Sequence, residues 1–145
     1  MAALVFDGHN DALSRLWGTM GDPVEEFAKS NGHVNVPNCS AGGMNGGFFA
    51  IYSPMRRKVF DFTQFDMAML TQPMPEIQED FALVSAMGQA AIARRLHDAG
   101  QIEIVTSAEA LARSFVAEPI TCVLHIEGAD CIGQCNLRLL CAAHR

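Results

Sequence analysis

No stretch of this sequence approaches the roughly 18–20 consecutive apolar residues that a transmembrane helix needs. Positive charge is also scarce, since the longest basic run is Arg56-Arg57-Lys58 and the formal net charge is −6. This balance argues against a nucleic-acid partner. The first six residues lack the basic start of a signal peptide and are followed at once by Asp7, so we expect a cytoplasmic location.

Cysteine is present in an odd number, five, in a chain without an export signal, which argues against a disulfide framework. Cys131, Cys135 and Cys141 lie close together near His144, but their spacing fits no common zinc module. We therefore expect no zinc site in this C-terminal group. The methionines between residues 55 and 74 are interpreted as core residues and not as ligands of copper or haem.

Half of the 145 residues are apolar and 18% are charged, a composition that excludes a disordered chain and suffices for one domain over residues 1–145. Short apolar runs predict strands over residues 2–6, 48–52, 102–105 and 121–126. Asp22 as a cap predicts a helix over residues 24–29, and a capping box from Thr106 to Glu109 predicts one over about 106–115. Helical periodicity predicts a third helix over residues 76–99, and the segment 53–75 is expected to be irregular. This alternation predicts an α/β protein with a parallel sheet.

Polar side chains follow the first and the last of these strands. His9 and Asp11 are two residues apart, so on extended chain both side chains face the same way, as two ligands of one metal ion would. Glu127 ends the last strand and is followed by Gly128, which leaves space beside its carboxylate. In a parallel sheet all three residues fall at the carboxyl edge, where α/β folds place their active sites.

Each of these residues also has a purely structural interpretation. His9 could cap a turn, and Glu127 could be a solvated strand end. His125 shares the face of Glu127 on an ideal strand and is interpreted either as a packed neighbour of the site or as a ligand. The glycines between 42 and 47 lack the order of a phosphate-binding loop and precede a strand. We expect a flexible turn there, a bend with positive φ angles that lets backbone pass close by.

Taken together, the motifs resemble the membrane (renal-type) dipeptidase family of zinc peptidases. The resemblance runs in order over residues 4–133. It is carried by Phe6-Asp7-Gly8-His9-Asn10-Asp11, Gly32-His33-Val34-Asn35-Val36-Pro37, Ala41-Gly42-Gly43, Gly46-Gly47-Phe48-Phe49-Ala50 and Ile126-Glu127-Gly128-Ala129-Asp130.

The resemblance implies a metal-dependent hydrolase of the (β/α)8 TIM-barrel type, of which this chain is the N-terminal half. It implies two zinc ions, with His9 and Asp11 ligating one and Glu127 bridging both, and a metal-bound hydroxide that attacks the peptide bond of a dipeptide. No further catalytic residue of the family motifs falls within the chain. Family members often form dimers, so the resemblance is compatible with a homodimer.

Two departures from the family pattern bear on function. Asn35 stands where the family commonly has aspartate, a position that is not a ligand. The chain is also much shorter than the roughly 250 residues of a barrel, and residues 134–145 do not resemble the family, so we expect a truncated or frameshifted dipeptidase. The alternative is an inactive remnant or a small metal-binding fragment, and we expect the chain alone to lack activity.

Overall fold

Four parallel strands form a single sheet in the computed structural model, which describes residues 4–29, 31–54, 71, 76–116 and 118–133. The predicted α/β class with a parallel sheet is thereby confirmed. In spatial order the strands are β1 (Val5–Asn10), β2 (Met44–Tyr52), β4 (Ile120–Glu127) and β3 (Ile102–Ile104).

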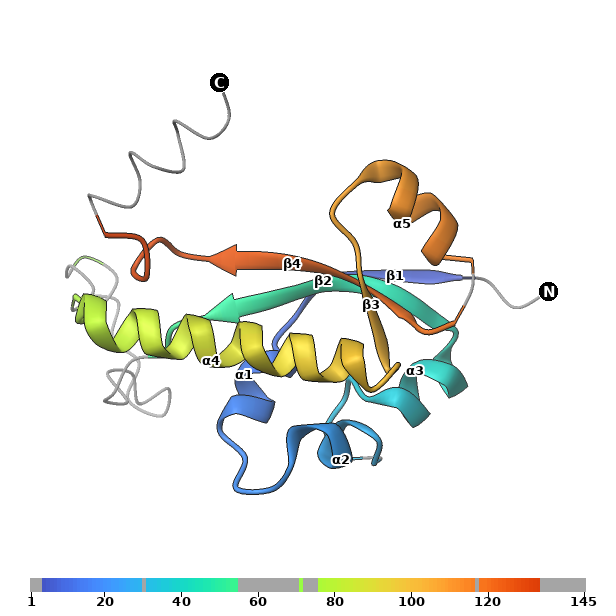
Figure 1. Cartoon of the computed structure of the whole chain (residues 1–145), viewed down its shortest axis with the longest axis horizontal. Coiled ribbons are helices and arrows are strands. Elements are labelled where there is room, and N and C mark those ends of the chain that lie inside the picture. Colours follow the sequence, from blue (N-terminus) through green and yellow to red (C-terminus); the bar gives the residue numbers. More distant parts are fainter. Residues whose placement is uncertain (1–3, 30, 55–70, 72–75, 117, 134–145) are drawn as a thin grey trace.

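Most of the helices lie on one face of this sheet (Figure 1). Figure 1 shows α1, α2 and α4 on that face and α5 on the other. The core between α4 and the sheet includes Leu16, Phe49 and Leu96, all fully buried or nearly so. The helices are α1 (Ala12–Trp17), α2 (Pro23–Phe27), α3 (Val36–Gly42), α4 (Glu79–Asp98) and α5 (Ala108–Ser114).

The strand order departs from chain order at one place. β4 pairs with β2 along seven residue pairs, from Gly46 with Thr121 to Tyr52 with Glu127. The short strand β3 pairs only with the first residues of β4, on its outer side. The connection from β2 to β4 therefore runs through α4, β3 and α5, and the strand that carries Glu127 lies next to the central strand β2.

The predicted elements differ from the observed ones mainly at their ends. The first strand extends to Asn10 and so includes His9, which was expected to follow it, while Asp11 does lie beyond its end. The long helix is Glu79–Asp98 instead of 76–99, and α1 and α3 were not predicted. Of the segment expected to be irregular, residues 55–70 and 72–75 lie outside the described residues, as does the C-terminal stretch 134–145.

The prediction for the glycine run is confirmed in part: backbone does pass close by, but Gly46 and Gly47 lie in a strand and not in a flexible turn. Only Gly43 has a positive φ, 70°, where it ends α3. Gly46 and Gly47 lie inside β2, where a Cβ atom would meet Thr121 of β4 and Asp7 of β1 at about 3 Å. These glycines allow three strands to approach closely.

Helix caps follow the sequence signals closely. Asp22 caps α2 by accepting a hydrogen bond of 2.8 Å from the Val24 amide, as predicted. At α5 the cap is Ser107, which accepts from the Ala110 amide, and not Thr106 as the capping-box pattern indicated. Among the described residues, we find no helix with the length and apolarity needed to span a membrane.

Asp22 also joins α2 to α4 through an ion pair with Arg95. This ion pair should make the stability of the fold depend on pH in the acid range. The Val24 amide and the Arg95 guanidinium, 2.6 Å away, hold the pKa of Asp22 below its ordinary value of 3.8. A lowered pKa stabilises the fold above the unfolded-state value and ceases to do so as pH falls through the folded-state value. We expect Asp22→Asn to lower the melting temperature at pH 7, and the gap from wild type to close below about pH 4.

Thermal unfolding across this pH range checks the expectation, because asparagine still caps a helix and only the charged contact is lost. Asp98→Asn is the control, since it removes an exposed pair with Arg94 within α4 and leaves α2 joined to α4. A gap that stays constant with pH would contradict the role of the Asp22 charge.

Candidate metal centre

Three donor side chains meet at the carboxyl edge of the sheet. His9 Nε2 lies 3.5 Å from Asp11 Oδ1 and 3.3 Å from Glu127 Oε2, so the imidazole stands between two carboxylates. The three donor atoms all lie within 4.8 Å of one another. The side chains of all three residues are about half exposed, so an ion could reach them from solvent. The residues predicted from the sequence are thus brought together.

The parallel sheet brings His9 and Glu127 together as predicted, but Asp11 reaches them for a different reason. β1 and β4 run parallel on either side of β2, so His9 and Glu127 reach the same edge. Asp11, however, lies beyond β1, at the N-cap position of α1, with φ −103° and ψ 28°. The two-residue alternation of a strand therefore does not place Asp11 beside His9; the turn into α1 does.

His9 faces the site because of an irregularity in β1 that sequence reasoning missed. Asp7 pairs with Gly47 and Asn10 pairs with Phe49, so Gly8 and His9 together stand opposite Phe48 alone. This β-bulge turns His9 to the sheet face that also carries Glu127, while Asn10 is buried on the other face. Gly8 was the available signal, because glycine within a strand often marks a bulge.

His125 contacts the candidate centre but is outside the donor group found among the described residues. Its ring lies edge-to-face against the ring of His9, with centroids 5.9 Å apart, and against that of Phe48 at 6.4 Å. The row of rings continues from Phe48 to Phe6 and on to Phe115, the C-cap residue of α5. Of the two interpretations left open for His125, the structure supports the packed neighbour.

The donor set suits a divalent cation such as zinc. One imidazole nitrogen and two carboxylates are ordinary zinc ligands, and the two acidic groups supply negative charge that a cation would offset. Two ligands of one zinc ion lie at most about 4.2 Å apart, the sum of two bonds of roughly 2.1 Å. Both distances from His9 meet this limit, and the bound of 4.8 Å on all three donor atoms lies close to it.

A cavity of about 510 Å³ adjoins these residues along the open side of β1. His9 and Asp11 line it together with Arg15, His33 and Val34. Arg15 is held by a hydrogen bond of 3.2 Å from its guanidinium to the carbonyl of Val34. The cavity is large enough for a small molecule to lie against the two donor side chains.

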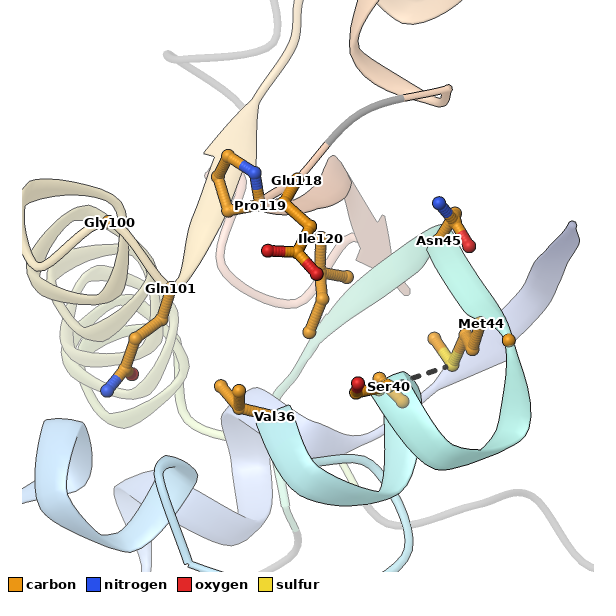
Figure 2. Close-up of a pocket in the computed structure, with 11 residues that line it drawn as sticks. Val36, Ser40, Met44, Asn45, Gly100, Gln101, Glu118, Pro119 and Ile120 are labelled. Atoms are coloured by element: carbon orange, nitrogen blue, oxygen red, sulfur yellow. Dashed lines mark hydrogen bonds between the residues drawn. The ribbon is translucent and has the colours of Figure 1, made fainter.

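A second cavity, of about 470 Å³, lies at the opposite, amino edge of the sheet (Figure 2). It is lined by Met44 of β2, Ile120 of β4 and residues of α3, and none of the three donors reaches it. Cys39 lies in its wall with its thiol 3.6 Å from the Met44 sulfur. This cavity therefore belongs to the packing between α3 and the strand starts.

The described cysteines take no part in the candidate centre. Cys39, Cys122 and Cys131 are free and buried. Burial raises the pKa of the Cys122 thiol to about 12, so the thiolate that metal binding requires is strongly disfavoured. Cys135, Cys141 and His144 lie outside the described residues.

Comparison with known proteins yields a family match over nearly the whole chain. The model of the membrane dipeptidase family, peptidase family M19, matches residues 1–143. An uncharacterised protein encoded in the PQQ-III 3′ region of Acinetobacter calcoaceticus is 32% identical over an alignment 146 positions long, which covers 90% of this chain and 42% of that protein.

Solved structures give the same result. The metallopeptidase dipeptidase AC, of family M19, superposes with a TM-score of 0.75 at 29% identity over 97% of this chain. A metallopeptidase from Rhodobacter sphaeroides, solved with a phosphinate mimic of the dipeptide L-Ala-D-Ala, gives 0.73 at 28% identity, again over 97% of this chain. The chain spans 41% and 42% of these two structures, respectively.

Proposed function

Because the chain belongs to the membrane dipeptidase family, peptidase family M19, we propose that its residues serve the metal-dependent hydrolysis of dipeptides, with His9, Asp11 and Glu127 as zinc ligands. The observation that carries this proposal is the convergence of the three donors at the carboxyl edge of a parallel sheet. This edge is where barrel-type enzymes carry out their chemistry. The dipeptide mimic in the Rhodobacter sphaeroides relative supports the substrate class.

Each side chain has a defined part in this proposal. His9 offers Nε2 at the centre of the group, and Asp11 offers a carboxylate that makes no capping bond to α1. Glu127 has two carboxylate oxygens, so it can serve two ions at once, as the family resemblance implies. The chemistry that zinc would supply there is polarisation of the peptide carbonyl and activation of water.

Backbone conformation keeps the approach to Glu127 open. Gly128 has a φ of 80°, a conformation that favours glycine, and it turns the chain immediately after β4. A Cβ atom at this position would lie 2.9 Å from a carboxylate oxygen of Asp130, so glycine also avoids crowding beside Glu127. The cavity beside His9 and Asp11 provides room for a small substrate next to the same group.

A second candidate function is zinc binding without turnover. It is favoured by the number of donors, because the part of the chain that the structure describes holds one group of three. A two-metal hydrolytic site requires further ligands and a group that moves protons. We therefore propose dipeptidase chemistry for the family site to which these residues belong, and no turnover for the 145-residue chain alone.

Zinc titration and an amino-acid release assay on the purified chain distinguish the two functions. We expect at most one zinc ion per chain and no release of amino acids from L-Ala-D-Ala. Metal-dependent release would make the chain itself an enzyme and overturn the second candidate. Absence of any zinc binding by the folded chain would contradict the ligand assignment.

A fusion protein tests the family function directly. In it, residues 1–133 of this chain replace the equivalent part of the Rhodobacter sphaeroides metallopeptidase. We expect metal-dependent hydrolysis of the dipeptide that disappears when Glu127 is changed to alanine. A folded, zinc-loaded fusion without turnover would contradict the proposed dipeptidase chemistry.

A further inference from the structure

Asn10 lies between two of the proposed ligands and is itself buried, with 7% of its surface exposed. Its Nδ2 donates to Asp7 Oδ2 at 3.0 Å and to the Phe48 carbonyl at 3.1 Å. Its Oδ1 accepts a hydrogen bond of 3.3 Å from the Ala12 amide. One side chain thus joins the start of the bulge in β1, the neighbouring strand β2 and the first turn of α1.

These hydrogen bonds fix the backbone on both sides of Asn10. The bond to Phe48 closes the bulge, since Phe48 is the residue that Gly8 and His9 both face. The bond from Ala12 fixes the first turn of α1, which begins immediately after Asp11. The positions of His9 and Asp11 relative to each other therefore depend on the same amide group.

The Asp11 carboxylate takes no part in capping α1. Aspartate at an N-cap position normally accepts a hydrogen bond from the first turn of its helix. Asp11 occupies the N-cap of α1 but makes no such bond. The Asn10 amide oxygen accepts from the amide of Ala12, the first helical residue, and so holds the start of α1 without the Asp11 carboxylate. The Asp11 carboxylate lies instead 3.5 Å from His9 Nε2.

We propose that Asn10 is a positioning residue that holds His9 and Asp11 in a metal-binding arrangement. The inference rests on the proposed function, because it assigns a purpose to the geometry of the same site. Asparagine is the side chain that this position requires: aspartate would have no donor and would face the Phe48 carbonyl and the Asp7 carboxylate with like charge. Groups that orient metal ligands typically contribute 10–100-fold to metal affinity.

Asn10→Asp tests the inference, with Asn35→Asp as a matched control. Asn35 is also buried, donates to two carbonyls, of Asn31 and Gly32, and accepts from one amide, of Asn38. Both changes thus remove two donated hydrogen bonds, and they differ in that one acceptor of Asn10 is the Asp7 carboxylate. We expect Asn10→Asp to weaken zinc binding by about 10–100-fold and to alter the visible spectrum of the Co²⁺-substituted chain. Asn35→Asp should leave both unchanged.

The outcomes separate this inference from the proposed function. If the wild-type chain fails to bind zinc, the proposed function fails first. If wild type binds zinc and the folded Asn10→Asp variant has the same affinity and Co²⁺ spectrum, the positioning role is refuted. Asn10→Ala, which introduces no charge, replaces Asn10→Asp if the latter does not fold. Equal zinc loss in Asn35→Asp, or unfolding of both Asn10 variants, would give Asn10 a purely structural role.

Discussion

Replacing Glu127 by alanine is expected to lower the zinc affinity of the chain by at least about 100-fold, because one of three donors is lost outright. The fold should be unaffected. Glu127 is the last residue of β4, its side chain is about half exposed, and its removal leaves no cavity. Surface substitutions of this kind usually change the free energy of unfolding by less than about 0.5 kcal/mol. Isothermal titration with zinc, together with urea unfolding of the metal-free chain, measures both quantities.

His33→Ala is the matched control for this prediction. His33 is exposed and lines the same cavity as His9 and Asp11, yet it is not part of the donor group. Its removal should leave zinc content and affinity nearly intact. Equal loss of zinc in the two variants would contradict the ligand assignment, since it would indicate binding spread over exposed polar groups.

Elements that depend on neighbouring residues in the sequence could be predicted, whereas contacts between distant segments could not. The helix α4 was found because twenty residues of regular periodicity outweigh any one exception. The helix α1 was missed because six residues offer too little periodicity. The helix α3 was also missed, but its start did carry a usable signal, an Asn35 cap followed by Val36 and Pro37. The strand order could not be predicted, because the pairing of β4 with β2 is a contact between distant segments.

The sequence predicted which residues form the candidate site, but not the strand register that orients them. Parallel strands bring their carboxyl ends to one edge, and this rule sufficed to associate His9 with Glu127. The bulge that turns His9 toward Glu127 is a property of register, which one strand alone does not determine. The role of Asn10 depends on that bulge, so it became visible only with the partner strand in place.

The largest stability effect is expected from Gly46→Ala in the central strand β2. A Cβ atom at this position would lie 2.9 Å from both the Cβ and the carbonyl oxygen of Thr121, and 3.1 Å from the Phe6 ring. Thr121 is fully buried and hydrogen-bonded to Ser114, so β4 cannot shift without disturbing α5. We expect a loss of about 3 kcal/mol, near the upper end for overpacking, from a total that is typically about 5–15 kcal/mol.

Urea unfolding of Gly46→Ala beside Gly42→Ala isolates this steric effect. Gly42 is the last residue of α3 and has open space where a Cβ would lie, so alanine there should be neutral or stabilising by up to about 1 kcal/mol. Comparable unfolding midpoints for the two variants would contradict the close approach of β2 and β4. Because Gly46 lies near the amino end of β2, remote from Glu127, the folded fraction of Gly46→Ala should still bind zinc with wild-type affinity. Gly46→Ala and Glu127→Ala should thus have opposite phenotypes, since close strand packing sets stability while the exposed donors at the carboxyl edge set metal binding.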